Sequence, residues 1–214
     1  MNKKQKKKIE LKKNISIVVN MALIILGLVG FIETIKILGK FDIKYYTLDS
    51  NLLAIIVELL YLYFVVVEEK IPRWLQLLKY IVILSLVITF VVVILVIAPM
   101  DNYRFGYYLF YSSQLYYHTL CPILAFLSFM FLENYSYEKK DRLYALSFTI
   151  IYAIIAIILN LIGIMNGPYP FLKIRLNPWY VSIMWLVVIL GMAYLLSNIL
   201  YYLKKKASKN FKYK

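Results

Sequence analysis

Hydrophobic residues occur along this chain in long runs, and short polar segments separate one run from the next. A helix needs about 20 predominantly apolar residues to cross the hydrocarbon core of a bilayer. Six runs reach that length, at residues 15–38, 47–67, 77–97, 107–132, 143–165 and 178–203. The pattern therefore predicts an all-α, polytopic membrane protein with six transmembrane helices over residues 15–203. Basic tails, residues 1–14 and 204–214, flank this domain.

The composition agrees with this class of protein. Hydrophobic residues make up 63% of the 214 residues, charged residues only 17%, and the mean hydropathy is +0.73. A soluble domain carries about 25% charged residues and leaves much of its chain exposed, so it could not hide this much apolar surface. Lipid is therefore the expected surrounding of most of the chain.

The net charge of +14 is typical of a nucleic-acid-binding protein only if the charge lies on a soluble surface. Here, nineteen of the 25 Lys and Arg residues fall in the two tails and in the loops on the same side of the predicted membrane. Such a bias predicts cytoplasmic N and C termini in a multi-pass protein of the cell membrane. The basic segments would contact anionic lipid headgroups, so nucleic acid is not an expected partner. Tyr107, Tyr108 and Tyr169 would belong to an aromatic belt at the outer interface.

His118 is the leading candidate for chemistry, because polar groups at membrane depth are costly and are therefore functional candidates. It is the single histidine of the chain and lies within the fourth run. Gln114, His118 and Cys121 share one helical face, and Pro122 frees the carbonyl of His118 from its usual helical partner. Two interpretations remain open. His118 acts as a general base or ligand-binding group, or it makes a hydrogen bond that joins two helices.

A second group of polar residues opens the second run, at Thr47, Asp49, Ser50 and Asn51. Thr47 is a good helix N-cap, and Asp49 in the first turn suits the positive end of the helix dipole. The same geometry would place a hydroxyl beside the free N–H groups of a helix N-terminus, which can stabilise an oxyanion. The structural and the catalytic interpretation both remain open for this group.

Glu58 follows Thr47 by three helical turns on the same face, and we expect it to support the site, with His118 as a possible partner. No glycine-rich phosphate loop, metal-spaced cluster or cofactor motif is present, so we expect no metal and no cofactor. Cys121 is the single cysteine, which excludes a disulfide within the chain and a thiolate metal cage.

Three ordered motifs resemble those of the androgen-induced-gene family of membrane proteins, which includes the androgen-dependent TFPI-regulating protein, and its prokaryotic six-helix relatives. The first motif, at residues 44–53, reads K-Y-Y-T-L-D-S-N-L-L. The second, at residues 118–124, reads H-T-L-C-P-I-L, and its proline comes one residue earlier than in the family. The third, at residues 167–172, reads G-P-Y-P-F-L and is one residue shorter than in the family.

This resemblance implies hydrolysis of lipid esters of the fatty-acid ester type, with Thr47 as the nucleophile and His118 as its base. Tyr169, Pro170 and Phe171 would close the outer mouth of the site. Counted along a helix from Tyr107, His118 would lie about 15 Å below the membrane surface. Thr47 could then reach it only if residues 40–46 dip into the membrane. The alternatives are a non-catalytic lipid-binding or small-molecule transport protein, and a structural membrane subunit.

Overall fold

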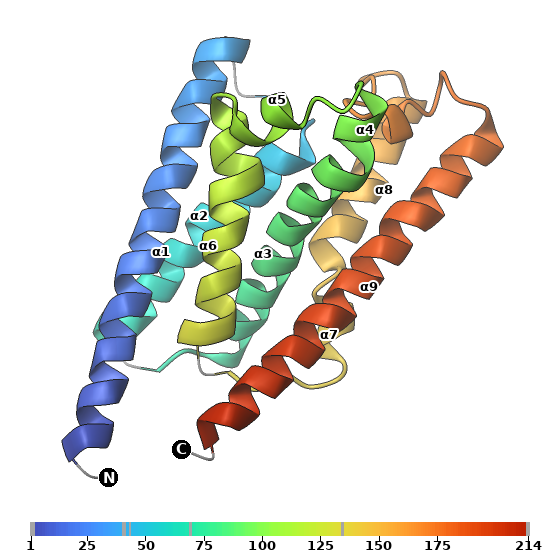
Figure 1. The fold of residues 1–214 in the computed structure, drawn as a ribbon. Helices are drawn as coiled ribbons and strands as arrows, with labels where there is room; N and C mark the ends of the chain where they lie inside the picture. The colour runs from blue at the N-terminus through green and yellow to red at the C-terminus, as the bar shows by residue number, and fades with distance from the viewer. Residues whose placement is uncertain (1–2, 40–41, 43, 69, 134, 213–214) are drawn as a thin grey trace.

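The structure is a computed structural model, and it describes residues 3–39, 42, 44–68, 70–133 and 135–212. These residues form helices and connecting segments without strands, and six helical stretches are long and apolar enough to cross a membrane. The expected all-α class and the six candidate spans are therefore confirmed. The start of α1 and the end of α9 lie at the same end of the bundle, which we call the terminal end (Figure 1). The other end is called the site end below.

Several of the spans are built from more than one helical segment. The first span lies in α1 (Lys3–Leu38), and the second is α2 (Tyr46–Tyr63) continued by the π-helix η1 (Phe64–Glu68). The third is α3 (Arg73–Val92), η2 (Val93–Ile97) and α4 (Ala98–Met100). The fourth is η3 (Leu115–Leu120), α6 (Cys121–Leu127) and η4 (Ser128–Leu132), and the short α5 (Phe105–Phe110) precedes it.

The last two spans complete the bundle. They are α7 (Asp141–Tyr144) with α8 (Ser147–Leu161), and α9 (Trp179–Lys212), and the 3₁₀ turn η5 (Pro170–Leu172) lies between them. Helix α3 is the most buried span, and it packs against α2, α6, α8 and α9. Helix α9 is the least buried span, and it runs along the outside of the bundle (Figure 1).

The fourth span begins later than the hydrophobic pattern predicted. We expected it to start at Tyr107, but Tyr107 lies in α5, and the candidate span starts at Leu115. The chain breaks between the two helices because Tyr111 is extended and Ser112 has a φ of +47°. His118 therefore lies about 5 Å along the helix from the start of the span, instead of about 15 Å. The fifth span also ends earlier than expected, at Leu161 rather than Met165.

A buried ion cluster joins the spans near the terminal end. The Nζ of Lys79 lies 2.6 Å from both carboxylate oxygens of Glu58 and 2.9 Å from Oε1 of Glu133. It also lies 3.3 Å from Oδ1 of Asn20, while Lys204 donates to the backbone carbonyls of Phe129 and Glu133. These residues come from α1, α2, α3, α9 and the end of η4, so the cluster ties five of the six spans together.

We expect Lys79→Ala to lower the free energy of unfolding by about 3–5 kcal/mol, because it leaves two buried carboxylates without their cation. Thermal and denaturant unfolding in detergent measures this change. Lys140→Ala is the matched control, since Lys140 pairs with Glu138 at 3.0 Å on the surface, and we expect it to leave stability unchanged. Equal stability of the two variants would contradict a structural role for the cluster. Replacing Lys79, Glu58 and Glu133 together by Met should restore much of the loss, because no buried charge then remains unpaired.

Candidate active site

Thr47 and His118, which are 71 residues apart in the sequence, meet at the site end of the bundle. The Oγ1 atom of Thr47 lies 3.2 Å from Nε2 of His118. Thr47 stands in the first turn of α2, where the chain leaves the extended conformation of Tyr45. His118 is buried in η3. The late start of the fourth span produces this contact, because it raises His118 to the depth at which α2 begins.

The break between α5 and η3 also fixes the orientation of the imidazole. Since α5 ends at Phe110, the carbonyl of Tyr108 is directed at His118 and lies 2.9 Å from Nδ1. The next carbonyl, of Leu109, accepts a hydrogen bond of 2.7 Å from the hydroxyl of Thr119. Two successive residues of η3 thus bind two successive carbonyls of α5. This pair of bonds holds α5 over the start of the span.

The hydrogen bond to Tyr108 decides which nitrogen of His118 carries the proton. A carbonyl oxygen can only accept, so Nδ1 must be the donor. In a neutral imidazole, Nε2 is then left with a free lone pair that faces the hydroxyl of Thr47. This is the arrangement that general-base activation of a hydroxyl requires, with the imidazole oriented by a third group. Here the third group is a backbone carbonyl.

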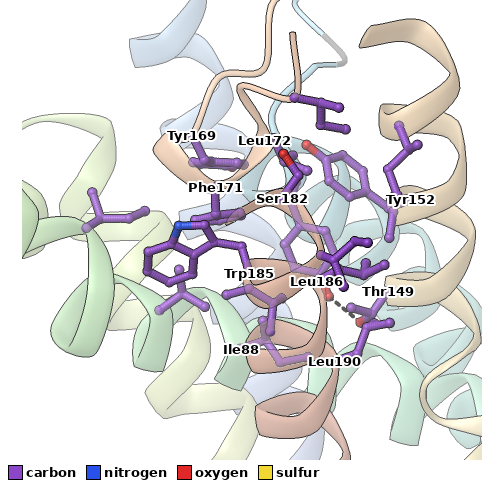
Figure 2. A pocket seen from close by; sticks show the side chains of 18 of the residues that line it. Ile88, Thr149, Tyr152, Tyr169, Phe171, Leu172, Ser182, Trp185, Leu186 and Leu190 are labelled. Carbon is purple, nitrogen blue, oxygen red and sulfur yellow. Dashed lines mark hydrogen bonds between the residues drawn. The ribbon is translucent and has the colours of Figure 1, made fainter. Parts of the chain in front are cut away.

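Tyr169 completes the surroundings of Thr47. Its hydroxyl lies 3.5 Å from Oγ1 of Thr47 and accepts the backbone N–H of the same residue at 3.4 Å. The ring stacks on Phe171, with an angle of 11° between the two planes. Both side chains are labelled in Figure 2. Desolvation by the surrounding protein raises the pKa of Tyr169 to about 12, so the phenol keeps its proton at physiological pH. It can therefore donate a hydrogen bond beside the threonine.

Two cavities meet at Thr47. The first, of about 320 Å³, lies among α2, α3, α8, α9 and η5 and is lined mainly by apolar side chains, including Ile88, Tyr152, Trp185 and Leu186 (Figure 2). We call it the apolar cavity. The second, of about 680 Å³, is lined by His118, by residues of α1 and α2 and by residues between Ile97 and Tyr117, and it has more polar surface than the first. We call it the polar cavity. Thr47, Ile97 and Tyr169 line both, so the threonine faces an apolar space on one side and a polar space on the other.

The remaining predicted residues of the third motif and of the fourth span also lie at the two cavities. Gln114 and Pro170 line the polar cavity, and Phe171 lines the apolar cavity.

The other polar residues in the first turn of α2 do not line the cavities, and two of them form hydrogen bonds to the helix backbone. Oγ of Ser50 and Nδ2 of Asn51 donate to the carbonyl of Thr47, at 3.1 Å and 2.8 Å. The backbone N–H of Asp49 donates to the carbonyl of Tyr45 at 3.1 Å, and Asp49 is not among the residues that line either cavity. These contacts fix the first helical turn and with it the position of the Thr47 hydroxyl.

Three expectations about this region need correction. Glu58 does not pair with His118, because it lies in the ion cluster at the terminal end and binds Lys79. Thr47 is not the N-cap of α2, since Tyr45 holds that position and makes no side-chain cap. A dip of residues 40–46 into the membrane is not needed for the contact, because the late start of η3 supplies it. That segment lies partly outside the described residues.

Sequence reasoning missed the role of the aromatic segment before the fourth span. We assigned Tyr107 and Tyr108 to an interfacial belt, but both line the polar cavity, and the backbone of Tyr108 orients His118. The adjacent Ser112 and Ser113, at the end of an aromatic stretch, are the one local signal for a break in the helix. Residues from four separate spans line the apolar cavity, so the sequence of any one segment could not predict it.

Comparison with protein-family models, with curated proteins and with solved structures finds no match to this chain. Within the described residues, no group of three or more His, Cys, Asp or Glu side chains could hold a metal ion. The site is therefore interpreted from its own geometry, as a hydroxyl–imidazole pair in a membrane-spanning helical bundle.

Gly30 allows α1 to approach the helix that carries His118. A Cβ atom at this position would lie 2.6 Å from Cε1 of Tyr117 and 3.1 Å from Cβ of Tyr116. We expect Gly30→Ala to lower the free energy of unfolding by about 1–3 kcal/mol, because Tyr117 is buried and has to move. Thermal unfolding in detergent measures the effect.

Gly191→Ala is the control for this test, because a Cβ there meets nothing within 4 Å. Alanine favours the helix over glycine by about 1 kcal/mol, so this variant should be as stable as the unmodified protein or slightly more stable. If the two alanine variants have the same stability, the close approach of α1 to η3 does not exist in solution.

Proposed function

We propose that this protein is an intramembrane hydrolase of apolar acyl esters, with Thr47 as the nucleophile and His118 as its general base. The observation that carries the proposal is the 3.2 Å contact between Oγ1 of Thr47 and Nε2 of His118, at the meeting point of an apolar and a polar cavity. The resemblance to the androgen-induced-gene family, carried by three motifs, implies the same two residues.

The first half of the reaction acylates the threonine. The hydroxyl oxygen of Thr47 attacks the ester carbonyl carbon as its proton passes to Nε2 of His118. The carbonyl of Tyr108 holds the opposite N–H and so stabilises the imidazolium that forms. The tetrahedral intermediate then collapses, and the leaving alcohol takes the proton from His118. The product of this half is an acyl ester on Thr47.

The second half consumes one water molecule. Water attacks the acyl carbon, gives one proton to His118 and releases the carboxylic acid, and the imidazole returns this proton to the oxygen of Thr47. The polar cavity is the route by which water reaches the acylated threonine, since His118 and Thr47 both line it. The sum of the two halves is an ester and water going to an acid and an alcohol.

Tyr169 is the side chain best placed to stabilise the oxyanion. Its neutral O–H lies 3.5 Å from the attacking oxygen, and the attacking threonine stands at the N-terminus of α2, where the helix dipole favours negative charge. An oxyanion that forms beside Thr47 would therefore meet a hydrogen-bond donor and a positive helix end. Both act in a site that lipid and protein shield from bulk water, which strengthens them.

The apolar cavity determines the orientation of the substrate. Its walls offer almost no partner for a polar group, whereas each buried methylene of an acyl chain contributes about 0.8 kcal/mol. The acyl chain therefore occupies the apolar cavity, whose lining side chains Figure 2 shows, and the alcohol portion lies in the polar cavity.

A second candidate function is ligand binding or transport without hydrolysis. The buried Lys79 cluster favours it, because ionisable groups inside a membrane often mark ion or proton pathways. None of Glu58, Lys79 and Glu133 lines either cavity, however, so ligand and cluster would not touch. A protein that binds the acyl ester but never cleaves it would fit this second function.

We further propose that both termini face the cytoplasm and that the protein lies in the cell membrane among anionic lipids. Nineteen of the 25 Lys and Arg residues fall in the tails, the loops or the adjoining helix ends on the side of the terminal end. Apart from Lys79 and Lys204, which are buried in the ion cluster, this is the distribution expected for cytoplasmic segments. The two cavities at the site end would then open toward the outer leaflet.

Single cysteines test this orientation after Cys121, which is buried, has been replaced by Ala. Leu176→Cys lies in the loop at the site end, and Lys206→Cys lies in the exposed last part of α9. A membrane-impermeant thiol reagent should label the first on intact cells and the second only after lysis, because the bilayer separates the two ends. Labelling of Lys206→Cys on intact cells would contradict the proposed orientation.

Hydrolysis of a nitrophenyl acyl ester by the full-length protein in detergent tests the function. Thr47→Ala should abolish turnover, and His118→Ala should lower kcat by about 10²–10⁴-fold, because the hydroxyl loses its base. A burst of nitrophenolate and an acyl adduct on Thr47 by mass spectrometry should accompany turnover of the unmodified protein. Tyr169→Phe should lower kcat with little change in KM, because its hydroxyl acts mainly in the transition state.

Ser147→Ala serves as the control, since Ser147 begins α8 and lines neither cavity, and it should keep full activity. Full activity in Thr47→Ala would exclude the proposed nucleophile. Binding of the ester without any turnover by the unmodified protein would favour the second candidate function.

A further inference from the structure

The charge of the polar cavity limits which esters this site can accept. We propose that the substrate carries an uncharged, hydroxyl-bearing alcohol portion, as in a monoacylglycerol, rather than an alcohol portion with a free carboxylate or a phosphate. This inference rests on the proposed hydrolase function and names its substrate class.

Among the described residues, Asp101 is the single Asp, Glu, Lys or Arg residue that lines the polar cavity. A second carboxylate stands just behind the wall, because Glu33 accepts a hydrogen bond of 3.1 Å from the hydroxyl of Ser112, which lines the cavity. An imidazolium at the buried His118 would be a charge without a carboxylate partner in the described part of the chain, which is costly, so we take the resting histidine as neutral. An anionic group entering this cavity would therefore find no cation among the described residues of its walls.

None of the described cations near the site end lines the cavity, and three of them are paired with carboxylates. Arg104 lies 3.4 Å from Asp101, Lys36 lies 3.2 Å from Glu33, and Lys44 lies 2.8 Å from Asp42. Arg104 and Lys36 are largely exposed to solvent. A carboxylate or phosphate would lose its hydration on entry without gaining an ion pair, and such a transfer is strongly unfavourable.

The same walls suit a neutral group that has hydroxyls. Side chains that carry hydroxyls line the cavity, among them Ser112, Tyr107 and Tyr111. A substrate hydroxyl both donates and accepts, so it can satisfy such groups. Gln114 and Ser113 offer further donors and acceptors, and Asp101 offers an acceptor.

Aromatic rings also line this cavity, and they can contact both the carbon and the oxygen atoms of a glycerol-type group. Tyr107 stacks on Tyr111, and the hydroxyl of Tyr108 donates to Asp101 at 3.0 Å. These three rings line the space between the site end and Thr47. They offer apolar faces to the carbon atoms of a small polyol and hydroxyls to its oxygens, which is the combination that an amphiphilic alcohol needs.

Two substrates that differ in one group test the inference. The first is a 1-acylglycerol, and the second is the matching acyl ester of glyceric acid, in which a carboxylate replaces one hydroxymethyl group. With the full-length protein in neutral detergent at pH 7, we expect kcat/KM to be at least about tenfold higher for the glycerol ester, because the carboxylate has no cation to bind. Gln114→Lys should reverse or remove this preference, because it places a cation in the cavity wall.

The possible results separate this inference from the function on which it rests. Equal kcat/KM values, or faster hydrolysis of the glyceric acid ester, would overturn the inference while leaving the hydrolase function intact. Failure to cleave either substrate or the nitrophenyl ester would overturn both. Binding of the uncleavable 1-alkylglycerol ether and of its glyceric acid counterpart to the Thr47→Ala variant supplies a second measurement. Tighter binding of the neutral ether supports the inference, and tighter binding of the anionic ether overturns it.

Discussion

A bilayer offers no hydrogen-bond partner to a polar group, and this constraint organises the whole protein. Polar side chains within the spans therefore bind one another or backbone carbonyls, and two groups of them lie at opposite ends of this bundle. At the terminal end, Lys79 lies between Glu58 and Glu133 and ties five spans together. At the site end, Thr47, His118 and Tyr169 meet beside two cavities. The first group stabilises the bundle, and the arrangement of the second depends on the helix positions that the first helps to set.

The break before the fourth span is the local feature that orients the imidazole in the second group. A continuous helix from Tyr107 would have used the carbonyl of Tyr108 in its own hydrogen bonds and carried His118 deep into the bundle. Because the helix stops at Phe110 and restarts after Ser112, this carbonyl is free to bind Nδ1 of His118. Pro122 lies just beyond the π-helix η3, where α6 begins, so helix irregularities lie on both sides of the histidine.

The use of a carbonyl in place of a carboxylate has a physical reason in this setting. A carboxylate beside His118 would add a charge to a region where unpaired charge is costly. A carbonyl fixes the tautomer and the orientation of the ring without such a cost, although it stabilises an imidazolium less than a carboxylate does. The polar cavity also has few charged groups, because its described walls carry apolar side chains, hydroxyls, an amide, the imidazole of His118 and a single carboxylate. In our proposal the uncharged alcohol portion of the substrate follows from this feature.

The sequence by itself determined the class of the fold, because runs of about 20 apolar residues have no other stable surrounding than lipid. It also identified Thr47 and His118 as candidates, since polar groups at membrane depth are rare and the three motifs fall around them. Tertiary structure decided what these residues touch. The partner of Glu58, the start of the fourth span and the direction of the Tyr108 carbonyl all depend on contacts between segments far apart in the chain. The two cavities depend on such contacts as well, because each is the space left between several spans, and a hydropathy pattern records which residues avoid water but not which helices become neighbours.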